Sequence, residues 1–169
     1  MGKVSYRFYN RGQAEEILPQ MFAILATNMG QIAPTGNRYE EDRRVWLSYM
    51  AAAQDTQILL MYVGETLAGY FQYRIEGATL LIDEIEIAPA YQRTLLFYGF
   101  FKFMAGILPG DVAYAQANIH KQNTNSQRIA AKLGLKVVGE NKNGRSGLYR
   151  GEIASFKKYL PKTEQKNRS

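Results

Sequence analysis

The sequence predicts an α+β domain in which about four helices accompany a mixed, mostly antiparallel central sheet of about seven strands. Segments in which apolar and polar residues alternate occur between segments whose apolar residues recur at helical spacing. Three strand segments follow one another through short turns, which is typical of an antiparallel meander. A strand, helix, strand passage at residues 79–119 requires a parallel crossover, so the sheet is expected to be mixed.

The first part of the chain is predicted to contain one strand and two amphipathic helices. Residues 4–9 alternate as a strand does. From Ala14 the apolar residues fall at helical intervals, which predicts a helix that ends before Gly30. A second helix is predicted from Asn37, with Glu40 as the second half of a capping box. Its predicted apolar stripe consists of Val45, Trp46, Tyr49, Met50 and Ala53.

The meander follows these helices. Residues 57–63 and 67–75 are predicted strands joined by a tight turn at Gly64. A second turn at Gly77 leads into a long strand over residues 79–88. The next segment, residues 92–108, is predicted to be a helix that is apolar nearly all round and therefore covered on most sides. Its predicted buried line is Leu96, Phe100, Phe103 and Ile107.

Short elements complete the predicted sheet. Residues 111–119 form a strand, and residues 125–133 form a helix that ends at Gly134 in a left-handed cap. Strands around Val137 and over residues 148–153 then form a hairpin. The dipeptide Asn143-Gly144 between these two strands is the strongest hairpin signal in the chain.

Composition limits the chemistry that this chain can perform. It has no cysteine and a single histidine, His120, which excludes disulfides, thiol nucleophiles and a multi-histidine metal centre, so no metal is expected. Carboxylates, tyrosines, lysines and hydroxyl groups remain as acids or bases. The 169 residues suit one domain over residues 1–160, followed by a polar tail over residues 161–169 that has nothing to bury.

Charge and hydropathy indicate the kind of partner. Residues 1–80 contain seven basic and eight acidic residues, a net charge of −1, whereas residues 81–169 contain fourteen and seven, a net charge of +7. The second half is therefore where an anionic ligand is expected to bind. Nucleic acid is disfavoured because aromatic and basic residues are not interleaved. The first ten residues lack a signal-peptide core, and Lys102 interrupts the longest apolar stretch, so we expect a cytoplasmic protein without a membrane span.

Three carboxylates lie in the otherwise aliphatic strand over residues 79–88. Alternation places Asp83 on one face of this strand, and Glu84 and Glu86 on the other. A carboxylate buried in such a strand has a raised pKa and becomes a better base. An exposed one instead pairs with a nearby lysine or arginine, and both alternatives stay open for each acid.

Two motifs carry a resemblance to a known family. Residues 87–92 read I-x-P-x-Y-Q, and residues 123–135 read N-x-x-S-x-R-I-A-x-K-L-G-L. They resemble the two cofactor-binding motifs of the GNAT superfamily of N-acetyltransferases. The resemblance covers about residues 4–153 and implies a GNAT-like fold that transfers an acetyl group from acetyl-CoA, as co-substrate, to a small-molecule or peptide amine. A homodimer is among the open alternatives.

The resemblance also implies site residues. Exposed backbone in the strand before the helix would hold the pantetheine arm, and amides of the following turn would surround the pyrophosphate. Asn123 and Ser126 would line the far side of the thioester, and Asn118 would orient a water. The full set implied for cofactor binding is Ile85, Ile87, Ala88, Gln92, Arg93, Thr94, Leu95, Leu96, Phe97, Asn118, Asn123 and Ser126.

The mechanism expected from this resemblance uses a carboxylate base and direct attack by the amine. Glu84 is the first choice as base, followed by Glu86 and Asp83. Ser126 or a water is the predicted acid for the leaving thiolate, because Ala130 stands where many members of the family carry a tyrosine. Leu95 and Phe97 occupy positions where the family has small residues. This departure keeps a second interpretation open, namely a ligand-binding or regulatory GNAT-fold protein that has lost transfer activity.

Overall fold

The computed structural model describes residues 2–159. The chain divides into two compact units, one formed by Met1–Tyr73 and Glu84–Thr94 and the other by Arg74–Asp83 and Leu95–Ser169. The predicted single domain over residues 1–160 stays a prediction. The predicted tail over residues 161–169 lies outside the described residues.

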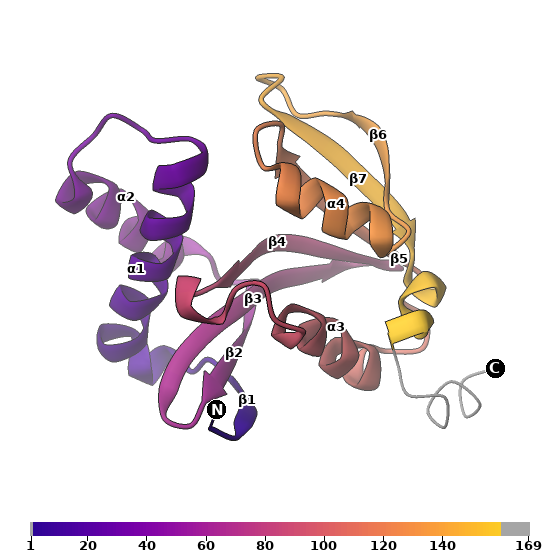
Figure 1. The fold of residues 1–169 in the computed structure, drawn as a ribbon, viewed down its shortest axis with the longest axis horizontal. Helices are drawn as coiled ribbons and strands as arrows, with labels where there is room; N and C mark the ends of the chain where they lie inside the picture. Colours follow the sequence, from indigo (N-terminus) through magenta and orange to yellow (C-terminus); the bar gives the residue numbers. More distant parts are fainter. Residues whose placement is uncertain (1, 160–169) are drawn as a thin grey trace. The chain divides into compact units, whose positions relative to one another are not determined.

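The described residues form a mixed sheet accompanied by helices (Figure 1). The strands are β1 (Val4–Phe8), β2 (Gln57–Val63), β3 (Thr66–Glu76), β4 (Thr79–Ile87), β5 (Tyr114–His120), β6 (Lys136–Glu140) and β7 (Ser146–Glu152). The helices are α1 (Ala14–Ile32), α2 (Tyr39–Ala52), α3 (Leu96–Ile107) and α4 (Thr124–Lys132), with short 3-10 turns η1 (Arg11–Gln13), η2 (Pro89–Tyr91) and η3 (Ile153–Tyr159).

The sheet has seven strands in the order β1-β2-β3-β4-β5-β7-β6. Strands β4 and β5 are parallel, and their pairing covers only Thr79–Ile82 of β4. The pairs β1 and β2, β2 and β3, β5 and β7, and β6 and β7 are antiparallel. The predicted fold class, α+β with a mixed and mostly antiparallel sheet, is therefore confirmed.

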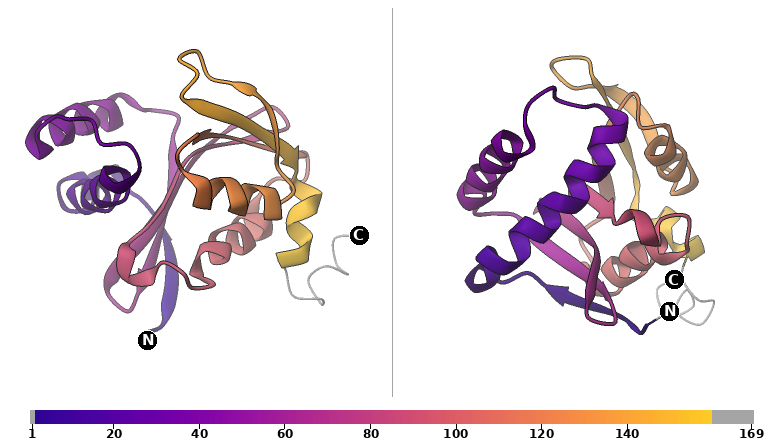
Figure 2. Two further views of the ribbon diagram at one scale, coloured as in Figure 1. Left: turned by 45° about the horizontal axis from the view of Figure 1, so that its top comes forward. Right: turned by 60° about the vertical axis from the view of Figure 1, so that its left-hand side comes forward.

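Helices α1 and α2 lie side by side in the first unit and pack on one face of β2 and β3 (Figure 2). The ring of Phe22 in α1 contacts Tyr39 and Trp46 of α2, with centroids 5.1 and 5.6 Å away. Each fully buried aliphatic side chain contributes roughly 1.5–3 kcal/mol. The buried cluster on this face consists of Ile17, Leu18, Met21, Ile24, Met50, Ile58, Leu60, Leu67 and Tyr70.

Helix α1 is longer than predicted. It continues through Gly30 to Ile32, whereas the sequence predicted an end before Gly30. A glycine ends a helix when it adopts a left-handed conformation, and Gly30 is not among the residues with positive φ. The helix instead ends at Ile32, because its C-cap residue Ala33 precedes Pro34 and a residue before proline disfavours helical dihedrals.

Helix α2 begins at Tyr39, and the predicted capping box on Asn37 is wrong. Its N-cap residue, Arg38, makes no side-chain capping bond. The Asn37 side chain and Thr35 instead donate to the Asp42 carboxylate, over 3.1 and 2.6 Å. These hydrogen bonds hold the pKa of Asp42 below its usual value. The carboxylate in the first turn therefore orders the preceding loop.

The buried side of α2 also differs from the predicted stripe. Met50 is buried, but Val45 and Tyr49 are 66% and 61% exposed. The inward side chains are Trp46, Leu47 and Met50, as Trp46 and Leu47 pack against the buried cluster. The predicted stripe is therefore right for Trp46 and Met50 and wrong for Val45 and Tyr49.

Helix α3, in the second unit, is almost entirely apolar, and its start was predicted four residues too early, at Gln92 instead of Leu96. Of its predicted buried line only Phe100 is buried, and Ile107 is 44% exposed. A helix that is apolar all round offers no polar contrast to indicate its inward side. No helix within residues 2–159 is both long and apolar enough to span a membrane. The buried residues of α3 are Phe100, Phe101, Met104 and Ala105.

Two glycines in the second unit behave as predicted. Gly134 has a φ of +83° directly after α4, and a Cβ there would lie 2.8 Å from the Ser155 side chain. Gly144 has a φ of +69° in the turn between β6 and β7. In that turn the Arg145 N–H donates to the Asn143 side chain over 2.9 Å. Both positions therefore require a residue that tolerates the left-handed region.

Candidate active site

The loop after β4 leaves the strand earlier, and enters the next helix later, than predicted. The Ala88 N–H donates to the Ala68 carbonyl over 2.8 Å, and η2 follows immediately. Gln92 is extended, with φ −69° and ψ 161°, and Arg93 has a φ of +61°. A left-handed residue interrupts a helix, so the predicted helical start at Gln92 is wrong. Arg93 adopts in this turn the left-handed conformation that glycine adopts most readily.

A buried amide from α1 meets this loop. Asn28 is 9% exposed, and its Nδ2 donates to Glu86 Oε2 over 2.7 Å and to the Ile87 carbonyl over 2.9 Å. Gln92 Nε2 donates to Asn28 Oδ1 and to the same Ile87 carbonyl, each over 2.9 Å. These four hydrogen bonds connect α1, the end of β4 and the following loop within the first unit.

Glu86 has a strongly perturbed carboxyl group. Burial raises the pKa of Glu86 to about 7, and the hydrogen bond from Asn28 opposes this rise. A carboxyl group with such a pKa exists in both forms at neutral pH. It can therefore accept a proton from an amine far better than an ordinary surface glutamate does.

Tyr70 of β3 lies near the two glutamates of β4. Its pKa is raised well above the usual value, first by burial and then by the charges of Glu84 and Glu86. Among the described residues its hydroxyl makes no hydrogen bond of ordinary length and angle. The Glu84 carboxylate is nevertheless near enough for hydrogen bonding to contribute to the raised pKa. The neutral phenol of Tyr70 is thus a donor placed beside two acids.

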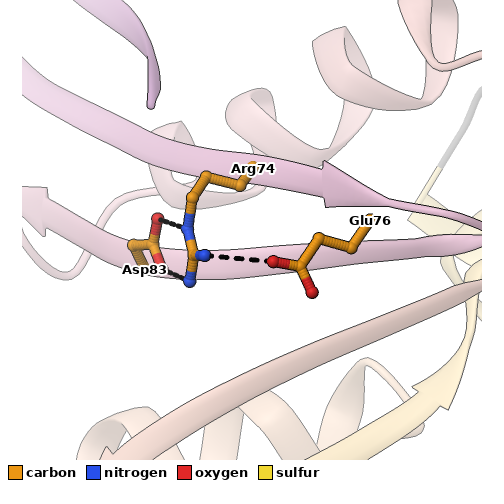
Figure 3. Close-up of polar contacts among 3 residues, drawn as sticks. All are labelled: Arg74, Glu76 and Asp83. Atoms are coloured by element: carbon orange, nitrogen blue, oxygen red, sulfur yellow. Dashed lines mark hydrogen bonds and ion pairs between the residues drawn. The ribbon is translucent and has the colours of Figure 1, made fainter. Parts of the chain in front are cut away.

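Asp83 is committed to an ion pair (Figure 3). Both of its carboxylate oxygens accept from Arg74, from Nε and NH2, over 3.0 Å each. Arg74 NH1 also contacts Glu76 over 3.2 Å. This pairing is the exposed alternative that the sequence left open for each acid. The ion pair gives Asp83 a structural role. Both Arg74 and Asp83 belong to the second unit.

The two large residues at the predicted pyrophosphate turn behave differently. Leu95 is the N-cap residue of α3, and its side chain is 82% exposed. Phe97 is half-buried, and its ring packs against Phe101 and Tyr98 with centroids 5.3 and 5.9 Å away. Leu95 itself makes no side-chain capping bond at the N-terminus of α3. Both residues belong to the second unit, whereas Gln92, Arg93 and Thr94 belong to the first.

The second motif builds the start of α4. Asn123 is the N-cap residue, and its side-chain oxygen accepts from the Ser126 N–H over 3.1 Å. The spacing N-x-x-S is therefore explained by helix capping. Ser126 is half-buried, and Asn118 is exposed on β5 opposite Leu148 of β7. These residues lie in the second unit, and their implied contacts with a cofactor stay predictions.

Replacing Asn123 by alanine is expected to lower the free energy of unfolding by about 1 kcal/mol, because the Ser126 N–H loses its acceptor. Asn123→Asp keeps an acceptor oxygen and is expected to retain the stability. Urea denaturation of both variants measures the difference. Equal destabilisation by both substitutions would argue against the capping role.

Comparison with known proteins identifies the fold. No protein-family profile matches the sequence, and no curated protein matches it. The N-acetyltransferase PaiA from Thermoplasma acidophilum, in complex with coenzyme A, matches with a TM-score of 0.71 at 14% identity, over 89% of this chain and 99% of that chain. An acetyltransferase of the GNAT family from Staphylococcus aureus matches with a TM-score of 0.69 at 7% identity, over 89% and 99%.

The chain has the GNAT fold. A ribosomal-protein-alanine N-acetyltransferase from Escherichia coli shares it, with a TM-score of 0.63 at 14% identity, over 89% of this chain and 94% of that chain. The GNAT fold was predicted from the two motifs and the order of elements. Identities this low mean that the likeness lies in the backbone, and the chemistry of the site has to be argued from its own residues.

No motif in the sequence indicates that Asn28 belongs to a functional site. It lies four residues before the end of α1 and is buried. An asparagine inside a helix is unfavourable for the helix itself, which is the one available hint that its side chain serves another purpose. Its partner Glu86 lies 58 residues away in the chain, so no local pattern could connect the two.

Proposed function

We propose that this protein is an N-acetyltransferase that moves the acetyl group of acetyl-CoA to an amine, with Glu86 as the base. The observation that carries the proposal is a half-buried carboxyl group with a pKa of about 7 at the end of β4 in a GNAT fold. When bound, acetyl-CoA supplies an activated acyl group as a thioester. Glu86 accepts the amine proton as the C–N bond forms and the C–S bond breaks. Coenzyme A leaves as a thiolate that is protonated to the thiol, with Ser126 or a water as the predicted proton donor.

Glu86 is preferred to Glu84, which the sequence favoured. Both acids lie on the same face of β4, and Glu86 is chosen because Asn28 donates to its carboxylate and because burial raises its pKa. Glu84 is the second candidate, because it lies near the buried Tyr70 hydroxyl. Asp83 is not proposed, since Arg74 holds both of its oxygens.

The backbone of β4 supports a role in holding the pantetheine arm, with a restriction. Pairing with β5 ends at Ile82, so the part of β4 that follows is not engaged by that strand. The Ala88 N–H is bonded to Ala68, however, and the Ile87 carbonyl accepts two side-chain amides. These two groups are therefore not proposed to bind the pantetheine arm. The proposal keeps the remaining backbone groups of Ile85 and Ile87.

The start of α3 supports binding of the pyrophosphate. A helix N-terminus presents backbone N–H groups and a positive dipole end to an anion, and α3 begins at Leu96. The Leu95 side chain is 82% exposed and so does not pack into the protein at this turn. The net charge of +7 over residues 81–169 is also favourable for a phosphorylated ligand.

Acetyl-CoA is expected to raise the thermal stability of the protein. At about 100 times its dissociation constant, a ligand that binds only the folded state stabilises it by roughly 2.7 kcal/mol. Differential scanning fluorimetry with acetyl-CoA, and with free adenosine as a control that lacks the pyrophosphate, measures this effect. An unchanged melting temperature at saturating acetyl-CoA would contradict the proposed function.

The acceptor is sought by following the thiol that leaves the thioester. The panel contains small amines and peptides with free N-termini, since the Escherichia coli structure that shares the fold is a ribosomal-protein-alanine N-acetyltransferase. Binding of acetyl-CoA without thiol release for any amine would favour the second interpretation, a GNAT-fold protein that binds its ligand without transfer. The presence of Leu95 and Phe97 at positions that are small in the family is the observation behind that interpretation. The cytoplasmic location and the homodimer stay predictions.

A further inference from the structure

We propose that Gln92 and Asn28 form a relay in which the loop after β4 holds the carboxylate of Glu86 in place. Gln92 bonds Asn28, which in turn bonds Glu86, so both amides are positioning residues. The proposal rests on the proposed function only where it names Glu86 as the base. The relay itself is a property of the first unit and can be tested without turnover.

One atom fixes the orientation of both amides. A backbone carbonyl oxygen can only accept hydrogen bonds, so the side chains that contact the Ile87 oxygen must present their NH2 groups to it. The Asn28 amide therefore turns its Nδ2 toward Ile87 and Glu86, and its Oδ1 toward Gln92. The reversed Asn28 amide would place its oxygen against the carboxylate, which is repulsive.

The relay uses every hydrogen of both NH2 groups. Asn28 Nδ2 donates to Glu86 and to Ile87, and Gln92 Nε2 donates to Asn28 and to Ile87. The Ile87 carbonyl accepts two bonds, which is its full capacity. Because each of these donors has an acceptor, the two amides have one preferred arrangement. Removing one amide leaves the other with an unpaired donor or acceptor, so its orientation is less well fixed.

Gln92 gives the relay a connection to the surface. Its side chain is exposed, whereas Asn28 is buried, and Arg93 directly after it has the left-handed conformation. A change in the conformation of this loop withdraws the Gln92 donor from Asn28 Oδ1. The Asn28 amide then loses one of the contacts that fix its orientation, and its hydrogen bond to Glu86, which stabilises the charged form of that carboxyl group, weakens.

Other titratable groups face Glu86, and their effects must be separated from those of the relay. Tyr70 approaches from β3, and Glu84 lies on the same strand. The hydrogen bonds of the relay join Asn28 and Gln92 to Glu86, to Ile87 and to each other, and substitution of either amide leaves Tyr70 and Glu84 in the chain. Their contributions to the pKa of Glu86 are therefore expected to be the same in variants of the two amides.

The test is the pKa of Glu86 in the full chain without cofactor, measured by NMR titration of 13C-labelled glutamate carboxyl groups. The Glu86 resonance is assigned by its absence from Glu86→Gln. Asn28→Ala is expected to raise this pKa by about one pH unit, because a hydrogen bond to a charged group is lost. Gln92→Ala is expected to raise it by a smaller amount, and the double variant to match Asn28→Ala alone.

Gln20→Ala is the matched control, since Gln20 is an exposed glutamine of α1 whose amide bonds only the Glu16 carbonyl. It is expected to leave the Glu86 pKa unchanged. A wild-type pKa in Gln92→Ala, or additive shifts in the double variant, would overturn the relay. If Asn28→Ala does not fold, the exposed Gln92→Ala decides by itself. The two proposals can fail separately. If the pKa of Glu86 shifts as expected in the variants but the protein transfers no acetyl group, the relay is supported and the proposed function is contradicted.

Discussion

Glu86→Gln is expected to lower kcat/KM for acetyl transfer by at least about 100-fold, because general-base catalysis typically contributes 100-fold to 10,000-fold. Glutamine keeps the shape of the side chain and can still accept from Asn28, so the fold is expected to remain intact. It cannot accept a proton from the amine. Steady-state kinetics with the acceptor identified by thiol release measure the loss.

Two further variants decide between the acids. Glu84→Gln is expected to cost far less than Glu86→Gln, and Glu65→Gln, in the exposed turn between β2 and β3, to cost nothing. The reverse order for the first two would restore the choice made from the sequence, Glu84. In the wild type, kcat/KM is expected to rise with pH through about 7, because the deprotonated form of Glu86 is the active one.

The stability of the folded chain is expected to fall as the pH rises from about 4.5 to about 8. The folded pKa of Glu86, about 7, is above the ordinary value of 4.5, so the folded state binds the proton more tightly than the unfolded state does. Stability from this group is complete below the unfolded pKa and is lost as the pH rises through the folded pKa. The difference between the two values corresponds to about 3 kcal/mol.

Urea denaturation at several pH values compares the wild type with Glu86→Gln. The variant cannot ionise, so it is expected to lack this part of the pH dependence and to be the more stable protein at pH 8. Glu65→Gln again serves as the control and should follow the wild type. Parallel curves for the wild type and Glu86→Gln would show that burial of this carboxyl group does not raise its pKa.

The base predicted from the sequence and the base proposed from the structure differ for a physical reason. Alternation along β4 correctly separates Asp83 from Glu84 and Glu86, but it says nothing about which neighbour each acid meets. Arg74 pairs with Asp83, nine residues away, and Asn28 bonds Glu86 across 58 residues. At Glu86 the effect of burial outweighs the hydrogen bond from Asn28, so the pKa of this carboxyl group is raised.

The sequence by itself determined the local geometry of this protein. Strands were found from alternation, and turns from glycines such as Gly134 and Gly144, because the left-handed backbone they adopt is a property of the residue itself. The tertiary structure decided what depends on distant neighbours. It determined the inward side of α3, where an all-apolar sequence has no preferred face, and it brought Asn28 and Gln92 to Glu86, since hydrogen bonds form between residues that folding alone makes adjacent.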